Sequence, residues 1–262
     1  MIGRELRRIA TAFTFMTRFP LVARWSSGES SELAASTRYF PLVGYAIGGL
    51  GAAAFYYSAY AFSHPVAALF AVIALVVMTG AFHEDGLADT ADGFGGAFET
   101  SRKLEIMRDS RIGTYGTAAL ISLFLLRWQL LTELPLELIF LAMISAHVIA
   151  RWSSLLIGWM LPYVREGASN KPMADGMGWR ELLVGTVLAS AWLLLEPEIH
   201  GISMLVAVLV ACVAAAIFRR QIGGVTGDAL GAANVTVEIV VLLVWNFAER
   251  LNFWWEQIQV PV

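Results

Sequence analysis

Apolar residues occur in seven long runs along the chain, separated by short polar segments. Most runs approach the ~20 residues that a helix needs to cross a bilayer. Each is expected to be helical, because backbone polar groups in lipid must be paired within their own segment. The pattern predicts an all-α polytopic membrane helix bundle of about seven transmembrane helices. The predicted spans are Phe40–Phe62, Val66–Phe82, Tyr115–Leu131, Leu138–Leu161, Leu182–Leu195 (the shortest), Ile202–Phe218 and Ala232–Ala248.

The composition supports lipid rather than water as the surroundings of these runs. Hydrophobic residues make up 58% of the chain and charged residues 15%, and the mean hydropathy is +0.65. A soluble chain has roughly 25% charged residues, so the composition argues strongly against a soluble enzyme. The net charge of −3 gives no indication of a nucleic-acid partner. The lone Cys212 offers neither an internal disulfide nor a metal-site spacing.

The basic residues alternate between the segments that join the runs. The segment before the first run holds six lysine and arginine residues. The segments between the second and third, the fourth and fifth, and the sixth and seventh runs hold four, three and two. These four segments therefore contain fifteen of the 18 basic residues. The segments Ser63–Pro65, Thr132–Pro135 and Glu196–Gly201 hold none. Because basic loops stay in the cytoplasm, the N-terminus is predicted inside and the C-terminus outside.

The first 39 residues form the N-terminal part of a single predicted membrane domain, residues 1–262. Ile9, Phe13 and Met16 alternate at helical spacing with Arg4 and Arg7, which predicts an amphipathic helix on the cytoplasmic side. Such a helix lies either on the membrane surface or against the other cytoplasmic loops.

An acidic sequence follows the second run, at the start of a predicted cytoplasmic loop spanning residues 83–114. No lysine or arginine occurs between Arg38 and Arg102. On a helix, Asp85, Asp89 and Asp92 lie within about 60° of one another, and Glu84 widens the arc to about 140°. Carboxylates on adjacent turns repel one another, and divalent cations prefer such oxygen ligands. We expect Glu84, Asp85, Asp89 and Asp92 to bind a metal; the alternative is a solvated acidic loop.

Basic residues follow in the same loop, and a metal beside arginines is suited to hold a pyrophosphate. We expect these basic residues, and two acidic residues near the last run, to bind phosphate or substrate. The alternative is that the basic residues serve only to keep this loop in the cytoplasm. The complete set is Arg102, Lys103, Arg108, Arg111, Arg165, Asp228 and Glu238.

Several polar residues lie within or beside the predicted spans. Asp228 precedes the last run, where it would either contact substrate or cap the helix N-terminus. A charged residue at membrane depth is expected to be functional or paired inward. Arg127, His147 and Arg151 are of this kind, and Arg151 with Glu238 is one possible structural pair.

Two motifs resemble a known family. Glu84-Asp85-Gly86-Leu87-Ala88-Asp89-Thr90-Ala91-Asp92-Gly93 is similar to the acidic motif of adenosylcobinamide-GDP ribazoletransferase, also called cobalamin synthase. Arg108–Gly116 resembles the segment that follows it there, and similar stretches at Tyr39–Gly44, Pro162–Arg165 and Gly223–Ala232 occur in the same order.

The resemblance implies an enzyme of the bacterial cytoplasmic (inner) membrane, with its active site facing the cytoplasm. The family joins adenosylcobinamide-GDP to α-ribazole, or to α-ribazole 5′-phosphate, and releases GMP. It requires a divalent metal, usually Mg²⁺. Asp89 and Asp92 are then the catalytic candidates for taking the proton of the attacking hydroxyl.

Other functions were weighed against the same residues. A CDP-alcohol phosphotransferase or a prenyltransferase also holds a diphosphate through aspartates, but Asp89–Gly96 contains no arginine and a second aspartate-rich loop is missing from the sequence. A divalent-cation transporter would require acidic residues in several spans, and Glu238 is the only one in mid-span. The sequence leaves the oligomeric state open, with a homo-oligomer among the possibilities.

Overall fold

The computed structural model describes residues 2–19, 25–26, 30–164 and 177–259. Within these ranges the regular elements are helices, and one isolated bridge pairs Tyr163 with Val225. The predicted all-α fold is therefore confirmed.

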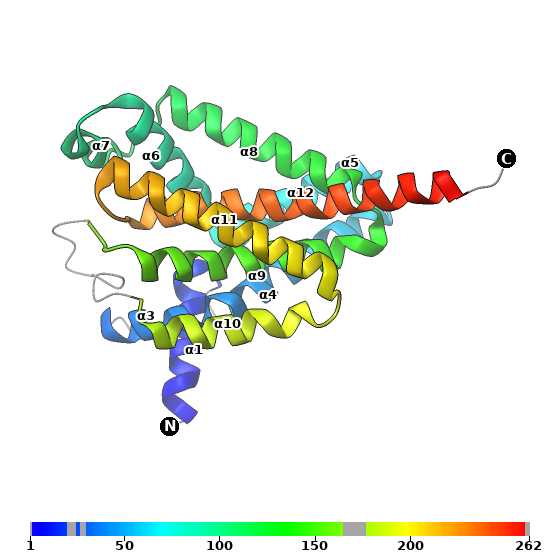
Figure 1. The fold of residues 1–262 in the computed structure, drawn as a ribbon, viewed down its shortest axis with the longest axis horizontal. Coiled ribbons are helices and arrows are strands. Elements are labelled where there is room, and N and C mark those ends of the chain that lie inside the picture. Colours follow the sequence, from blue (N-terminus) through cyan, green and yellow to red (C-terminus); the bar gives the residue numbers. More distant parts are fainter. Residues whose placement is uncertain (1, 20–24, 27–29, 165–176, 260–262) are drawn as a thin grey trace.

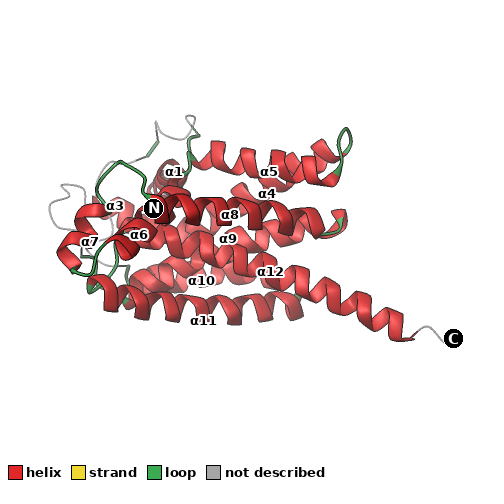
Figure 2. Ribbon diagram, turned by 90° about the horizontal axis from the view of Figure 1, so that it is seen from above, coloured by secondary structure: helices red, strands yellow, loops and turns green. Residues whose placement is uncertain are grey.

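Seven long helices lie side by side along the longest axis of the molecule (Figures 1 and 2). Each contains most of one predicted apolar run. Central α9 packs against α4, α10, α11 and α12. The seven are α4 (Phe40–Ala59), α5 (His64–Thr79), α8 (Thr114–Glu133), α9 (Leu136–Met160), α10 (Trp179–Leu193), α11 (Pro197–Ile222) and α12 (Gly227–Gln259).

Four stretches are long and apolar enough to cross a membrane: 32–59, 136–160, 197–222 and 227–251. Helix α5 forms a fifth only together with the helix that follows it. The chain is thus a multi-pass membrane protein. The count of seven spans and the side of the N-terminus stay predictions, because α10 has only 15 residues and α8 carries a buried arginine at its middle.

The remaining helices gather at one end of the bundle, which we call the α7 end (Figures 1 and 2). They include α6, which extends from the interior to this end and forms, with α7, most of the predicted acidic and basic loop. The opposite end carries the α4–α5 and α8–α9 connections and the C-terminus (Figure 2). The elements of this group are α1 (Ile2–Met16), α3 (Ser30–Ser36), η1 (Thr37–Tyr39), α6 (Phe82–Gly96) and α7 (Thr100–Ile106).

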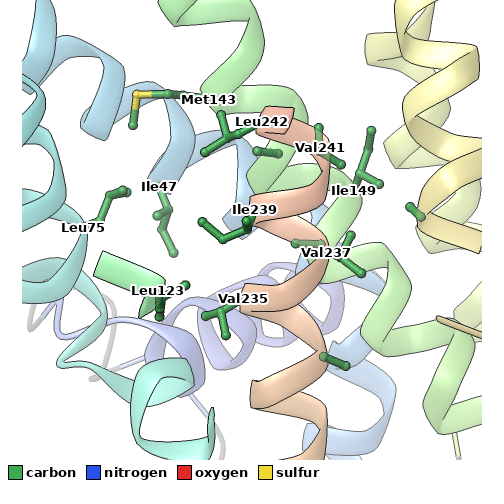
Figure 3. Close-up of a cluster of buried hydrophobic side chains, with 14 of the residues drawn as sticks. Ile47, Leu75, Leu123, Met143, Ile149, Val235, Val237, Ile239, Val241 and Leu242 are labelled. Atoms are coloured by element: carbon green, nitrogen blue, oxygen red, sulfur yellow. The ribbon is translucent and has the colours of Figure 1, made fainter. Parts of the chain in front are cut away.

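Small residues allow the central helices to approach closely. A Cβ atom on Gly44 of α4 would lie 2.6 Å from the carbonyl oxygen of His147, and one on Gly48 would lie 2.7 Å from Cα of Ile144. Both glycines therefore let α4 contact the backbone of α9, as small residues spaced by four do in membrane helix pairs. Figure 3 shows the apolar side chains that fill the adjoining core, among them Ile47 and Met143.

The predicted second span, Val66–Phe82, is wrong at its end. Helix α5 stops at Thr79, and the axes of α5 and α6 differ by 87°. Gly80 and Ala81 take left-handed conformations, with φ of 64° and 58°. The Arg18 amide donates to the Met78 carbonyl at 2.7 Å, which pairs one backbone group freed by the break.

Candidate active site

The four acidic residues of α6 divide between two faces of the helix. Asp85 is exposed and Asp89 is half-buried, whereas Asp92 is buried. Glu84 is buried on the side that faces the bundle core. The predicted shared arc of Asp85, Asp89 and Asp92 is therefore present on a helix, while Glu84 points to different neighbours.

The Asp92 carboxylate caps the N-terminus of α8. Its Oδ2 accepts the Gly113 amide at 2.7 Å, and its Oδ1 accepts the Gly116 amide at 2.8 Å. A carboxylate at a helix N-terminus pairs amides that have no partner within the helix. A Cβ atom on Gly113 or Gly116 would lie 2.5 or 2.4 Å from the Asp92 carboxylate. Glycine is therefore needed at both positions, because the Asp92 carboxylate occupies the space that a Cβ atom would fill.

Helix α12 contacts the acidic turn of α6 backbone to backbone. A Cβ atom on Gly86 would lie 2.7 Å from the carbonyl oxygen of Asp228. This contact brings the backbone of Asp228 beside the helical turn that carries Asp85 and Asp89. The helix-cap alternative for Asp228 is wrong, because the Thr226 hydroxyl accepts the Ala229 amide at 3.1 Å and caps α12.

A buried charge network lies on the core side of α6. Arg127 of α8 donates through Nη1 to Glu84 Oε1 at 2.9 Å, and its Nε lies 2.7 Å from Glu238 Oε1 on α12. His147 Nδ1 lies 3.4 Å from the other oxygen of Glu238. Arg151 contacts His147 at 3.2 Å. The pair proposed from sequence, Arg151 with Glu238, is replaced by Arg127 with Glu238.

The predicted phosphate-binding residues are spread around the α7 end. Arg111 is exposed and pairs with Asp109 at 2.6 Å, which lowers the pKa of Asp109 to about 2. Arg102 pairs with Glu105 at 2.7 Å, also in solvent. Lys103 is buried and donates to Gln221 of α11 at 2.5 Å. The structure therefore places Arg102 and Arg111 in solvent and gives Lys103 a partner within the fold.

Two further predicted residues complete this set. Arg108 is exposed at the end of α7. Arg165 lies outside the described residues, so the structure gives no position for it.

An open pocket of about 400 Å³ lies where α6, α7 and α8 meet. Asp92, Gly113 and Tyr115 line it, together with the ion pair of Asp109 and Arg111. A volume of this size is within the range of small-ligand sites. The pocket therefore joins the C-terminal half of the acidic face of α6 to a surface arginine.

The donor atoms on this face suit a hard divalent cation, although they do not form a complete cage. Among the described residues, no three His, Cys, Asp or Glu side chains are placed to hold a metal ion. Mg²⁺ usually takes one or two carboxylates and completes its shell with water and substrate phosphates. Asp85 and Asp89, one turn apart with Asp228 beside them, fit that mode of binding.

Sequence reasoning missed how these residues are supported. It did not predict that Asp92 caps α8, nor that Arg127 joins Glu84 to Glu238. The Gly113-x-x-Gly116 spacing was a usable signal, because glycines three apart at a helix start leave room for an incoming side chain.

Comparison with known proteins shows a family relationship over most of the chain. The sequence profile of the family described as cobalamin-5-phosphate synthase matches residues 8–246. An adenosylcobinamide-GDP ribazoletransferase from Shewanella amazonensis is 43% identical over 250 residues, covering 92% of this chain and 95% of the relative. Two relatives of that name, from Shewanella baltica and Shewanella halifaxensis, are 40% and 41% identical, covering 92% and 90% of this chain and 94% and 93% of their own length. No solved structure matches the chain. Because the profile and these relatives both span nine-tenths of the sequence, the chain belongs to the cobalamin-5-phosphate synthase family.

Proposed function

We propose that the acidic face of α6 and the surrounding α7 end form the active site of this transferase. As a family member, the chain transfers the adenosylcobinamide phosphate group from adenosylcobinamide-GDP to α-ribazole or α-ribazole 5′-phosphate. The products are adenosylcobalamin or its 5′-phosphate and GMP. The observation that carries the site assignment is the single face of α6 shared by Asp85, Asp89 and Asp92, next to Asp228 and an arginine-lined pocket.

The reaction is a phosphoryl transfer, in which positioning and charge stabilisation contribute most of the rate. A ribose hydroxyl oxygen of the acceptor forms a bond to the phosphorus that carries cobinamide. The bond from that phosphorus to the bridging oxygen breaks, and GMP departs with the electron pair. The hydroxyl proton passes to a carboxylate. We assign this step to Asp89, the half-buried carboxylate that lies between Asp85 and the pocket at Asp92 on the acidic face of α6.

We further propose that Asp85 and Asp89 hold Mg²⁺, with water and substrate phosphates completing its shell. When bound, the ion offsets negative charge on the pyrophosphate oxygens. Arg102, Arg108, Arg111 and Arg165 contact the remaining phosphate oxygens. The pairs of Arg102 with Glu105 and Arg111 with Asp109 are in solvent, where exchange for a phosphate costs little. Glu84 is assigned instead to the support of α6, because its carboxylate pairs with Arg127 in the core.

The location of the site follows from the arginines of the α7 end. In a bacterial inner membrane, basic segments face the cytoplasm. We therefore place the α7 end, and the active site with it, on the cytoplasmic side.

The experiment is an assay on purified protein reconstituted in lipid. Adenosylcobinamide-GDP, α-ribazole 5′-phosphate and Mg²⁺ are supplied, and GMP release and cobalamin 5′-phosphate are followed together. GMP formation is expected to require the acceptor and to stop after chelation of Mg²⁺. Absence of both products would contradict the assignment. A product from CDP-alcohols or prenyl diphosphates, or cation flux into the vesicles, would favour the corresponding alternative.

A further inference from the structure

A second cleft, of about 430 Å³, lies at the break between α5 and α6. The C-terminal part of α1 forms one wall, and the ends of the broken helix form another, with Thr79 before the break and Phe82 after it. Broken helices at membrane depth are tolerated where the freed backbone is buried in protein or lines a cavity. The break therefore coincides with a cavity of ligand size.

The lining combines hydroxyl groups, aromatic rings and one cation. Five threonine and serine residues line the cleft, together with Phe15, Leu33 and Phe82. The rings of Phe15 and Phe82 pack edge to face, with centroids 5.2 Å apart, and 40% of Phe82 remains exposed. None of the described lining residues is acidic. The cleft thus presents an aromatic surface and several neutral hydrogen-bonding groups.

Two polar groups in the cleft are suited to a ligand. The Thr14 hydroxyl oxygen is buried and has no hydrogen-bond partner among the described residues. Arg18 is exposed, and its side chain lies across Gly80, where a Cβ atom would come within 3.0 Å of Arg18 Cγ. A buried hydroxyl without a partner is costly unless a ligand or water completes it. Arg18 adds a site for one anionic group at the edge of the cleft.

The cleft lies on the same side of α6 as the acidic face. At ~100° per residue, Phe82, Asp85, Asp89 and Asp92 lie within an arc of about 80°. At ~1.5 Å per residue, Asp89 is about 10 Å further along the axis than Phe82, and Asp92 about 15 Å. The neutral cleft and the charged pocket at Asp92 therefore lie at opposite ends of one acidic stripe.

We propose that this cleft is the binding site for the acceptor nucleoside, a flat aromatic base carrying a ribose. This proposal rests on the proposed function. The base packs against Phe82 and Phe15, Thr14 pairs with a polar atom of the nucleoside, and the ribose extends towards Asp85 and Asp89. Arg18 binds the phosphate of a 5′-phosphorylated acceptor. The pyrophosphate donor, which needs cations, occupies the charged pocket with Arg111 at the other end of the stripe.

Steady-state kinetics of reconstituted variants test this assignment. Phe82→Ala is expected to raise the KM for α-ribazole about tenfold, because the base loses the aromatic ring on which it stacks. Thr14→Val is expected to raise it by a smaller factor. Arg18→Gln should raise the KM for α-ribazole 5′-phosphate and leave that for α-ribazole unchanged. The KM for adenosylcobinamide-GDP should stay constant in all three. Phe247→Ala, at a residue that is 66% exposed on α12, is the matched control.

A labelling experiment separates this proposal from the proposed function, since it needs no turnover. Phe82→Cys is prepared with Cys212→Ser, and maleimide labelling of the introduced thiol is timed. α-Ribazole is expected to slow labelling, and adenosylcobinamide-GDP is not. Equal labelling with and without α-ribazole, protection by the donor alone, or protection by anionic phospholipid alone would each overturn the acceptor assignment. If α-ribazole protects the introduced thiol while the wild-type protein is inactive in the GMP assay, the result would instead count against the reaction.

Discussion

Each carboxylate of the acidic motif has its own surroundings, although the four lie within nine positions. Glu84 is paired in the core, and Asp92 caps α8. Asp85 is exposed. Because side-chain direction on α6 decides these contacts, the four residues are expected to differ in what their removal costs: stability at Glu84 and Asp92, turnover at Asp85 and Asp89.

Asp89→Asn keeps the shape of the side chain and removes its charge. We expect turnover to fall at least a hundredfold, since a proton acceptor alone contributes about 10²–10⁴. The midpoint of thermal unfolding should change little, because the amide keeps the shape of the side chain and reduces the repulsion among the like charges on this face. GMP release is measured across a Mg²⁺ titration. Glu198→Gln, at an exposed position of α11, is the control. Near-normal activity of Asp89→Asn at subsaturating Mg²⁺ would rule out Asp89 as a ligand.

Gly116→Ala is predicted to destabilise the protein by about 1–3 kcal/mol, the usual range for overpacking. The new Cβ atom would lie 2.4 Å from Asp92 Oδ2 and 2.9 Å from the Ala88 carbonyl oxygen. Neither the carboxylate, which is held by two amides, nor the backbone carbonyl can move away easily. Gly201→Ala on α11 is the matched control, because a Cβ there meets nothing within 4 Å. That change should raise stability by roughly 0.5–1 kcal/mol. Equal unfolding midpoints for the two variants in detergent would contradict the tight contact at Asp92.

At the scale of whole elements, α6 lies between α12 and α8 and makes a different kind of contact with each. Backbone contact through Gly86 joins it to α12, and Asp92 joins it to the start of α8. Arg127 then ties its first turn to α8 and α12 together. The residue lies thirteen positions into α8, which is about 20 Å of helix. Helix α6 thus extends from deep in the bundle to the α7 end, with its acidic face held in one orientation.

Arg127→Met is expected to cost about 3–5 kcal/mol, because it removes the ion-pair partner of two buried carboxylates, Glu84 and Glu238. The triple change Arg127→Met, Glu84→Gln, Glu238→Gln removes all three charges and should recover much of that loss. Thermal unfolding in detergent micelles measures both. If the triple variant were as unstable as the single one, the cost would come from lost packing rather than from unpaired charge.

At the scale of the whole molecule, the two ends differ in chemistry. The α7 end carries α6, α7 and the arginine residues of their connection, whereas the opposite end carries short connections without lysine or arginine (Figure 2). Between the ends, α11 presents Leu205, Leu209 and Val213 outwards, each more than half exposed, and buries small alanines against the bundle. This arrangement is typical of a helix that faces lipid.

A topology experiment follows from this asymmetry. A reporter fused after Val262 is expected outside, and one inserted near Arg102 is expected inside, because basic segments remain cytoplasmic. Alkaline phosphatase and fluorescent-protein fusions report the two sides. A cytoplasmic C-terminus would reduce the number of spans by one. Helix α10, with 15 residues, is the first candidate for a segment that does not cross.

Local patterns in the sequence were sufficient to predict the helical elements. Apolar runs predicted the seven long helices to within a few residues at most ends, because membrane helices satisfy their hydrogen bonds within one segment. The spacing of Asp85, Asp89 and Asp92 predicted a shared face, because helix geometry alone sets that angle. The alternation of basic segments with segments that lack lysine and arginine distinguishes the two ends of the bundle.

Only the tertiary structure decided which residues meet. Periodicity gives the direction of a side chain around its own helix axis, but not the helix that lies in that direction. Glu84 was therefore predicted to bind the metal with the three aspartates, at the edge of their arc, whereas in the structure Arg127 of α8 lies against it. The 87° break after Thr79 could not be predicted from local sequence for a similar reason. Apolar sequence continues across Gly80 and Ala81, and the bend is stabilised by contacts from Arg18, more than sixty residues away along the chain.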